Sequence, residues 1–147
     1  MRREMTQHMV LRVISKILIP LILLFALYVQ FHGDYGPGGG FQAGVIFAAA
    51  IILYALVFSL ERAEKVVPLE SLQVHLAVGV LLFGGVGVVC LLEGGNFLDY
   101  NVLSPDPHHP QHGQHLGILL IELGVGLTVT AAMTTIFFAF AKRERNL

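Results

Sequence analysis

Between two long apolar segments stands the sequence His32-Gly33-Asp34-Tyr35-Gly36-Pro37-Gly38-Gly39-Gly40-Phe41-Gln42-Ala43-Gly44. Proline has no amide hydrogen to donate, and glycine adopts backbone angles that other residues avoid, so this run cannot extend the preceding helix. It predicts a tight turn after which the next helix starts close to a neighbouring backbone. The residues expected to form this turn and a contact with a neighbouring protein are Pro37, Gly38, Gly39, Gly40, Phe41 and Gly44.

The glycine run has two other interpretations. Gly38, Gly40 and Ala43 fit the dinucleotide-binding pattern G-x-G-x-x-A, but that motif requires a preceding strand within a βαβ unit. The flanking segments are instead long, apolar and helical in character, and no Gly-Lys-Ser/Thr ends the run as a Walker motif requires. The remaining alternative is a plain turn between two membrane helices that has no further role.

The composition is that of a membrane protein. The chain has 147 residues, of which 55% are hydrophobic and 13% are charged, whereas about a quarter of the residues in a soluble domain are charged. A membrane-spanning helix needs about 20 mostly apolar residues. Four segments satisfy this length, at about residues 10–31, 40–60, 74–92 and 116–141, with an outer loop at residues 93–115. We therefore expect a single all-α domain, residues 1–147, that crosses the membrane four times.

The positive charges predict the orientation of the chain. If the N-terminus is cytoplasmic, all nine Lys and Arg residues fall in the N-terminal stretch, the linker 61–73 or the C-terminal tail. The two loops on the other side hold Asp34, Glu93, Asp99 and Asp106 but no Lys or Arg. Since cytoplasmic loops are enriched in Lys and Arg, both termini are expected in the cytoplasm. The net charge of −1 gives no basic surface for nucleic acid.

Small residues repeat along the expected spans. In the second span, Gly36, Gly40, Gly44 and Ala48 recur every four residues, and the third and fourth spans carry further glycines. Because lipid provides no hydrophobic effect between helices, association depends on such small faces. They indicate that the helices pack against each other, against other proteins of a larger assembly, or both. Cys90, the single cysteine, is expected to pack as a small hydrophobic residue.

Three titratable residues are candidates for a role in transport. Glu122 is the one carboxylate well inside a predicted span, roughly 9 Å beyond Leu116 along the helix. A carboxylate in lipid is costly, so it should face protein or water, either as an ion or proton site or as a structural hydrogen-bonding group. His75 and His32 could relay protons, because imidazole titrates near neutral pH, or could be structural. The threonines further along the fourth span are expected to bond back to their own helix.

The outer loop contains a histidine-rich tract that includes His108, His112 and His115. Spacings of four and three residues suit metal binding on a helix, but Pro107 and Pro110 argue against a helix there. Histidine-rich tracts also bind metal adventitiously. We therefore expect no specific metal site and no cofactor.

These features together resemble a known family. The string Pro37-Gly38-Gly39-Gly40-Phe41-Gln42 opens a membrane helix in a short chain with four spans, and in this it resembles the small B-type subunits of the Mrp-type multisubunit sodium/proton antiporters. Ala43 stands where such proteins often carry another glycine. The resemblance covers nearly the whole chain but says nothing about the histidine-rich loop.

The resemblance implies a multi-pass protein of the bacterial inner membrane, within a complex that exchanges cytoplasmic sodium for external protons at the expense of the proton motive force. Proton translocation in that family is attributed mainly to larger subunits. This chain would then be a small accessory subunit, not an enzyme, that is needed for assembly and could line the sodium path. Its expected partners are the other antiporter subunits, sodium ions, protons and the lipid bilayer.

Three alternatives to the antiporter assignment stay open. Related four-span subunits occur in membrane-bound hydrogenases and similar complexes. A purely structural scaffold has the same sequence features. A quinone or haem anchor is less consistent with the sequence, because haem needs axial ligands inside the bundle and His75, near the end of a span, is the one histidine in any predicted span.

Overall fold

The computed structural model describes residues 2–33, 38–104 and 111–145, and the side chains of residues 9–33, 38–104 and 111–143. The described elements are α1 (Arg2–Gln30), α2 (Gly40–Phe58), α3 (Leu60–Val66), α4 (Leu69–Leu92), the short 3-10 helix η1 (Tyr100–Leu103) and α5 (Gln111–Arg145). Helices α1, α2, α4 and α5 each contain a stretch that is long and apolar enough to cross a membrane. The expected all-α fold with four membrane-spanning helices is confirmed.

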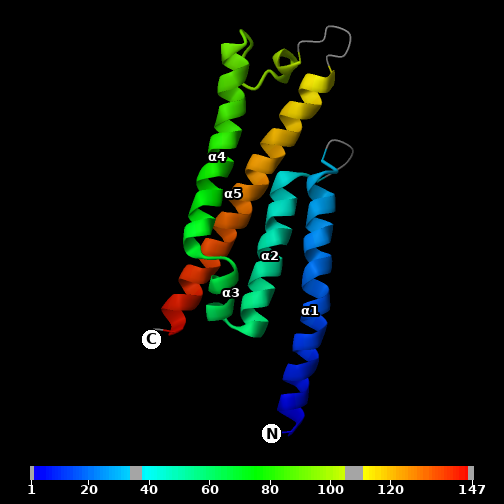
Figure 1. Ribbon diagram of the computed structural model, residues 1–147, viewed down its shortest axis with the longest axis vertical. Coiled ribbons are helices and arrows are strands. Elements are labelled where there is room, and N and C mark those ends of the chain that lie inside the picture. Colours follow the sequence, from blue (N-terminus) through cyan, green and yellow to red (C-terminus); the bar gives the residue numbers. More distant parts are fainter. Residues whose placement is uncertain (1, 34–37, 105–110, 146–147) are drawn as a thin grey trace.

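Helix α5 lies at the centre of the arrangement. Figure 1 shows α4, α5, α2 and α1 side by side in that order, and the main helix contacts are α4 with α5, α2 with α5, and α1 with α2. The α1–α2 turn and η1 lie toward one end of the molecule. Helix α3, the start of α1 and the end of α5 lie toward the other end (Figure 1).

The α1–α2 turn meets α5 partway along its length. Gly40, the first residue of α2, packs against Glu122, the twelfth residue of α5. The eleven residues of α5 that precede Glu122 extend past the turn by roughly 16 Å, at 1.5 Å per residue. The α1–α2 hairpin is therefore staggered relative to the α4–α5 pair, as Figure 1 shows.

Close packing of α5 against its neighbours depends on small residues. Gly40, Gly44 and Ala48, which belong to the four-residue repeat, are all buried. On the other side of α5, Gly79 of α4 and Gly124 of α5 each lie against the backbone of the other helix. Small faces let helix backbones approach closely, and here they join helices of the same chain.

The helix bounds differ from the sequence expectation at both loops. Residues 61–73, expected as a linker, are mostly helical, because α3 follows α2 after Ser59 and α4 starts directly after Pro68. Ser59 has a φ of 111°, a conformation that is rare outside glycine and that ends α2. At the other loop, α5 begins at Gln111, so residues 111–115 belong to a helix.

Two smaller expectations can be compared with the structure. Cys90 is fully buried, which confirms its packing as a small hydrophobic residue. Thr128 and Thr130 donate hydroxyl hydrogen bonds to the carbonyl oxygens of Gly124 and Gly126, at 2.8 and 2.7 Å, which confirms bonding back to the helix for these two residues. The expectation is wrong for Thr134, whose buried Oγ1 has no hydrogen-bond partner among the described residues.

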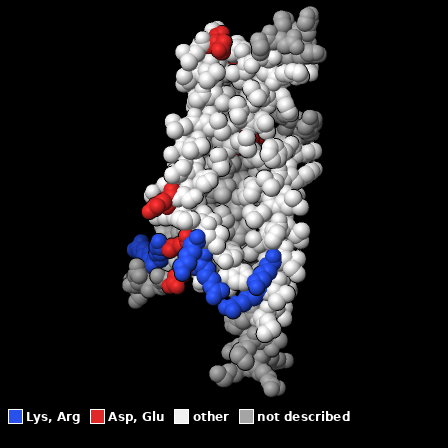
Figure 2. Space-filling model, in the orientation of Figure 1, with Lys and Arg blue, Asp and Glu red and all other residues white. Residues whose placement is uncertain are grey.

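Lysine and arginine side chains gather at one end of the molecule, which we call the basic end; the opposite end is the far end. Figure 2 shows them as a band across the lower part of the view. Lys142 Nζ lies 2.8 Å from Glu64 Oε1, which joins the end of α5 to α3. The described members of the band are Arg12, Lys16, Arg62, Lys65, Lys142 and Arg143.

We predict that the basic end faces the cytoplasm, because cytoplasmic loops carry the excess of Lys and Arg. Since Cys90 is the sole cysteine, a Cys90→Ala background allows single cysteines to be placed at the exposed positions Lys65 and Asn101. A membrane-impermeant maleimide should label the Asn101→Cys variant in intact cells and the Lys65→Cys variant only after permeabilisation. The reverse pattern would contradict this orientation.

Candidate functional site

The glycine run and Glu122 form one site. Glu122 lies on α5, and its carboxylate packs against Gly33 and Gly39 of the α1–α2 turn. A Cβ atom at either glycine would lie within 3.0 Å of a carboxylate oxygen, closer than real Cβ atoms come to other atoms. We call Gly33, Gly39 and Gly40 the glycine socket. The fold thus brings the glycine run and Glu122, which are far apart in the sequence, into contact.

The start of α2 is held directly against α5. Gly39, the N-cap residue, has φ 130° and ψ −166°, a conformation that is essentially restricted to glycine. At Gly40, an added Cβ would clash with the backbone carbonyl of Glu122. The socket therefore requires glycine for two reasons, the backbone conformation at Gly39 and the lack of space at Gly40.

The carboxylate of Glu122 lies at the N-terminal end of α2. The first four amide groups of a helix have no partner within the helix, and this end carries a positive partial charge. The N-cap residue Gly39 provides no side-chain cap. The site therefore favours a negatively charged group, and Glu122, which is half-buried, places one there.

His32 and Phe41 border the socket. The His32 ring stacks on Tyr28, with ring centroids 5.0 Å apart and an angle of 20° between the planes. His32 directly precedes Gly33 in the sequence, and its ring lies back along α1. Phe41 is 65% exposed. Its ring is therefore available for a contact outside this chain.

The remaining residues of the expected turn differ in how tightly they are enclosed. Gly38 has room for a methyl group, because the nearest atoms to an added Cβ would lie 3.5 Å away or more. At Gly44 an added Cβ would lie 2.8 Å from the carbonyl oxygen of Gly126. The Gly44 carbonyl also accepts a hydrogen bond from the Thr130 hydroxyl at 3.2 Å. Pro37 lies outside the described residues.

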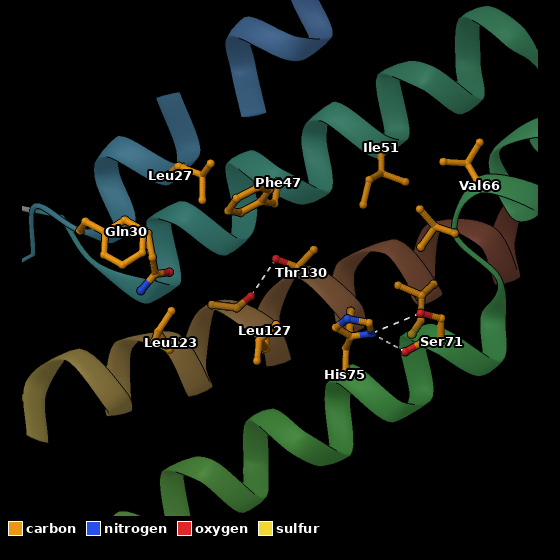
Figure 3. A pocket seen from close by; sticks show the side chains of 15 residues that line it. Leu27, Gln30, Phe47, Ile51, Val66, Ser71, His75, Leu123, Leu127 and Thr130 are labelled. Carbon is orange, nitrogen blue, oxygen red and sulfur yellow. Dashed lines mark hydrogen bonds between the residues drawn. The ribbon is translucent and has the colours of Figure 1, made fainter. Parts of the chain in front are cut away.

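His75 lies apart from the socket. Its Nδ1 is 2.6 Å from the backbone oxygen of Ser71, the residue one turn earlier on α4. A carbonyl oxygen can only accept, so Nδ1 donates this hydrogen bond. The ring lines a cavity between the helices, with Leu127 and Thr130 of α5 on the facing wall (Figure 3). The structure thus brings the glycine run and Glu122 together but not His75.

Gln30 is a buried polar residue that is absent from the sequence candidates. It is the last residue of α1, is 4% exposed and lines the same cavity as His75. Its Oε1 lies so close to Gly126 that a Cβ there would be 2.5 Å away. Its Nε2 has no hydrogen-bond partner among the described residues. The feature of the sequence that could have identified Gln30 is its amide side chain at the end of an apolar span.

Within residues 2–33, 38–104 and 111–145, no group of three His, Cys, Asp or Glu side chains is placed to hold a metal ion. Of the histidine-rich tract, His112 and His115 lie in the first turns of α5. His108 and His109 lie outside the described residues.

Comparison with known proteins finds a family match and several relatives. Residues 10–135 match the family described as a domain related to the MnhB subunit of Na+/H+ antiporter. A protein of Staphylococcus haemolyticus named for the antiporter subunit mnhB2 is 34% identical over 134 residues, which cover 90% of this chain and 93% of the relative. Relatives with the same name in Staphylococcus epidermidis and Staphylococcus aureus are 32% and 29% identical, with the same coverage.

The close contact at Gly40 predicts a large effect of a small substitution. Gly40→Ala should force α2 away from α5 and destabilise the chain by about 1–3 kcal/mol, the usual range for overpacking. Gly84 of α4 is a matched control, because an added Cβ there would meet no atom within 4 Å. Gly84→Ala should be neutral, or stabilising by up to about 1 kcal/mol through helix propensity.

Thermal unfolding of the purified chain in detergent measures both variants of this pair. Equal melting temperatures for Gly40→Ala and the unmodified chain would contradict the close contact. A decrease in the melting temperature of Gly84→Ala as large as that of Gly40→Ala would also contradict the close contact.

Proposed function

The chain belongs to the family of domains related to the MnhB subunit of Na+/H+ antiporters, and on this basis we propose that it is a small accessory subunit of an Mrp-type multisubunit sodium/proton antiporter. The matched residues, 10–135, reach from the first membrane helix into the fourth. The relatives are named as antiporter subunits and come from bacteria. The protein is accordingly a multi-pass protein of the bacterial inner membrane, with other antiporter subunits as its partners.

Within this function, we propose that Glu122 contributes to the passage of a cation or a proton. The observation that carries this proposal is the contact of its carboxylate with the glycine socket. Placing an ionisable residue inside a membrane helix is energetically costly, and the residues found there often belong to ion or proton pathways. Here the carboxylate lies against the positive end of α2 rather than against lipid.

The depth of the socket supports the same role. Glu122 lies six residues beyond Leu116 on α5, roughly 9 Å into the apolar part of the helix. The turn that contacts it includes non-helical backbone at Gly39. Non-helical backbone at membrane depth is tolerated where it is buried in protein or lines a water-filled cavity. A carboxylate beside such backbone offers oxygen ligands, which hard cations prefer.

We predict that Glu122→Gln assembles normally but loses antiport or shifts its pH dependence. Glutamine keeps the size and hydrogen bonding of the side chain but removes its charge and titration. Glu93→Gln is a matched control, because Glu93 is exposed at the end of α4, away from the socket. The measurement is sodium-driven proton movement in membrane vesicles, with assembly followed on blue-native gels.

Wild-type rates and pH dependence in the Glu122→Gln variant would retire the ion-site proposal. They would leave a structural carboxyl group in a scaffold protein. In that case Glu122→Ala should still weaken helix association, by about 1–2 kcal/mol.

Phe41 is the proposed contact with a neighbouring protein of the complex, because it stands beside the socket yet is mostly exposed in this chain. Phe41→Ala should leave the melting temperature of the purified chain within a few degrees of the unmodified value, since its ring packs little here. It should lower the amount of intact complex on blue-native gels. Leu56→Ala, on the same helix and 70% exposed, is the control and should assemble normally. Full assembly of the Phe41→Ala complex would favour the plain turn.

A further inference from the structure

An apolar groove of about 280 Å³ lies between α1, α2 and α3, toward the basic end of the molecule. Ile19 and Leu23 line it from α1, Ala50 and Tyr54 from α2, and Val66 from α3. Its walls expose no polar atom. Such a surface suits a hydrocarbon chain and offers nothing to an ion or to ordered water, which needs two to four polar partners.

The stripe of α1 that lines the groove continues toward the basic end as two cations. Arg12 and Lys16 precede Ile19 and Leu23 at spacings of four, three and four residues, and residues three and four apart lie on one face of a helix. Because Ile19 and Leu23 line the groove, Arg12 and Lys16 lie on the same side of α1, one to two turns nearer the basic end. Both side chains are exposed.

Helix α3 adds a cation on the other side of the groove. Arg62 stands four residues before Val66, which lines the groove, so the two share one face of α3. The Arg62 side chain is exposed. Figure 2 shows the band of Lys and Arg side chains reaching across this end of the molecule to the region where Figure 1 draws α1. The groove is therefore flanked by positive charge from two helices.

The chain provides these cations with no counter-ion. None of Arg12, Lys16 and Arg62 makes an ion pair with a carboxylate of the described residues, and the Glu64 carboxylate of α3 is paired with Lys142. Arg12 and Lys16 also lie inside the candidate span that begins at Met9, roughly 5 and 10 Å from its start. Cations at such a depth extend toward the membrane interface to reach water or an anion.

The shape and charge of the groove select among possible occupants. A helix of another protein, 10–12 Å across, would fill roughly 500 Å³ over the 6 Å between Ile19 and Leu23, more than the groove offers. A soluble anion would leave the apolar walls uncovered, and a neutral apolar molecule would leave the cations without a partner. A zwitterionic headgroup would add an ammonium group where positive charge is already in excess. An amphiphile with an acyl chain and a net negative headgroup satisfies both features.

We propose that the groove binds one anionic phospholipid from the leaflet at the basic end. Its acyl chain would pack between α1 and α2 beside Leu23 and Tyr54, and its phosphate would accept hydrogen bonds from Lys16 and Arg62. Arginine matches phosphate oxygens bidentately, and basic pockets between membrane helices bind anionic headgroups. Because α1 contacts chiefly α2, a lipid held here would also join α1 to α3.

Photo-crosslinking of the complete complex tests the proposal. The complex is reconstituted in phosphatidylcholine vesicles that contain a small fraction of one of two probes, phosphatidylglycerol or phosphatidylethanolamine, each with the same diazirine on its acyl chain. After irradiation, the labelled residues of this chain are mapped by mass spectrometry. We expect the anionic probe to label segments 19–23 and 50–54 at least fivefold more than the zwitterionic probe. Exposed helix faces should be labelled equally by both.

Three charge variants separate a site from general attraction to the basic end. Lys16→Gln and Arg62→Gln should each lower groove labelling by the anionic probe about fivefold, the contribution of one cation near a membrane surface. Arg143→Gln is the matched control, because Arg143 is an exposed cation of the basic end on α5, which does not line the groove. It should leave groove labelling unchanged within twofold.

A second pair of variants tests the groove itself. Leu23→Trp places a larger side chain in the groove and should lower labelling of segment 50–54 at least tenfold. Leu24→Trp, at the next position of α1, which is 64% exposed, should leave that labelling unchanged.

Four results would overturn the proposal. They are a groove that stays unlabelled while exposed faces are labelled, equal labelling of the groove by both probes, and an effect of Arg143→Gln as large as that of Lys16→Gln. The fourth is crosslinking of benzoylphenylalanine at position 23 to another protein of the complex, which would show that a protein segment covers the groove. The first two readings use the unmodified chain, so they decide the question even if a variant fails to assemble.

Discussion

The contact between Glu122 and the α1–α2 turn is the constraint on which the rest of the structure depends. Gly33 and Gly39 lack side chains where the carboxylate lies, and Gly40 lacks one where the α5 backbone lies. Glycine loses more conformational freedom on folding than other residues, so three such positions are justified only by the close approach that they permit. That approach fixes where α2 starts, and therefore fixes the stagger between the α1–α2 hairpin and α5.

The packing between the membrane helices likewise depends on residues with small side chains or none. The buried residues of α2 are mostly alanine and glycine, while large apolar residues such as Leu24, Leu56 and Leu81 are exposed. In lipid this distribution is favourable, since helices gain little by burying leucine and gain more from close backbone contact. At the basic end, α3 closes the bundle and a cluster around Leu72 and Phe138 forms a core with larger side chains.

Much of this fold could be predicted from the sequence because its signals are local. Span lengths, the four-residue repeat of small residues and the turn at the glycine run each depend on neighbouring residues. The contact between Gly40 and Glu122 could not be predicted from the sequence, because it joins positions 82 residues apart and depends on how α2 packs on α5. The same holds for Gln30, whose importance comes from its burial beside Gly126. The break at Ser59 was missed because serine rarely adopts a positive φ.

The source of positive charge at the socket bears on how a carboxylate there could serve transport. The described Lys and Arg side chains lie at the basic end, and the N-terminus of α2 lies beside Glu122. A lysine or arginine would carry a full charge and hold the carboxylate in a lasting ion pair. A helix terminus carries only about half an elementary charge. It can offset part of the cost of burying the carboxylate. Glycine at positions 33, 39 and 40 suits this arrangement, since it brings backbone dipoles close to the carboxylate without adding a competing side chain.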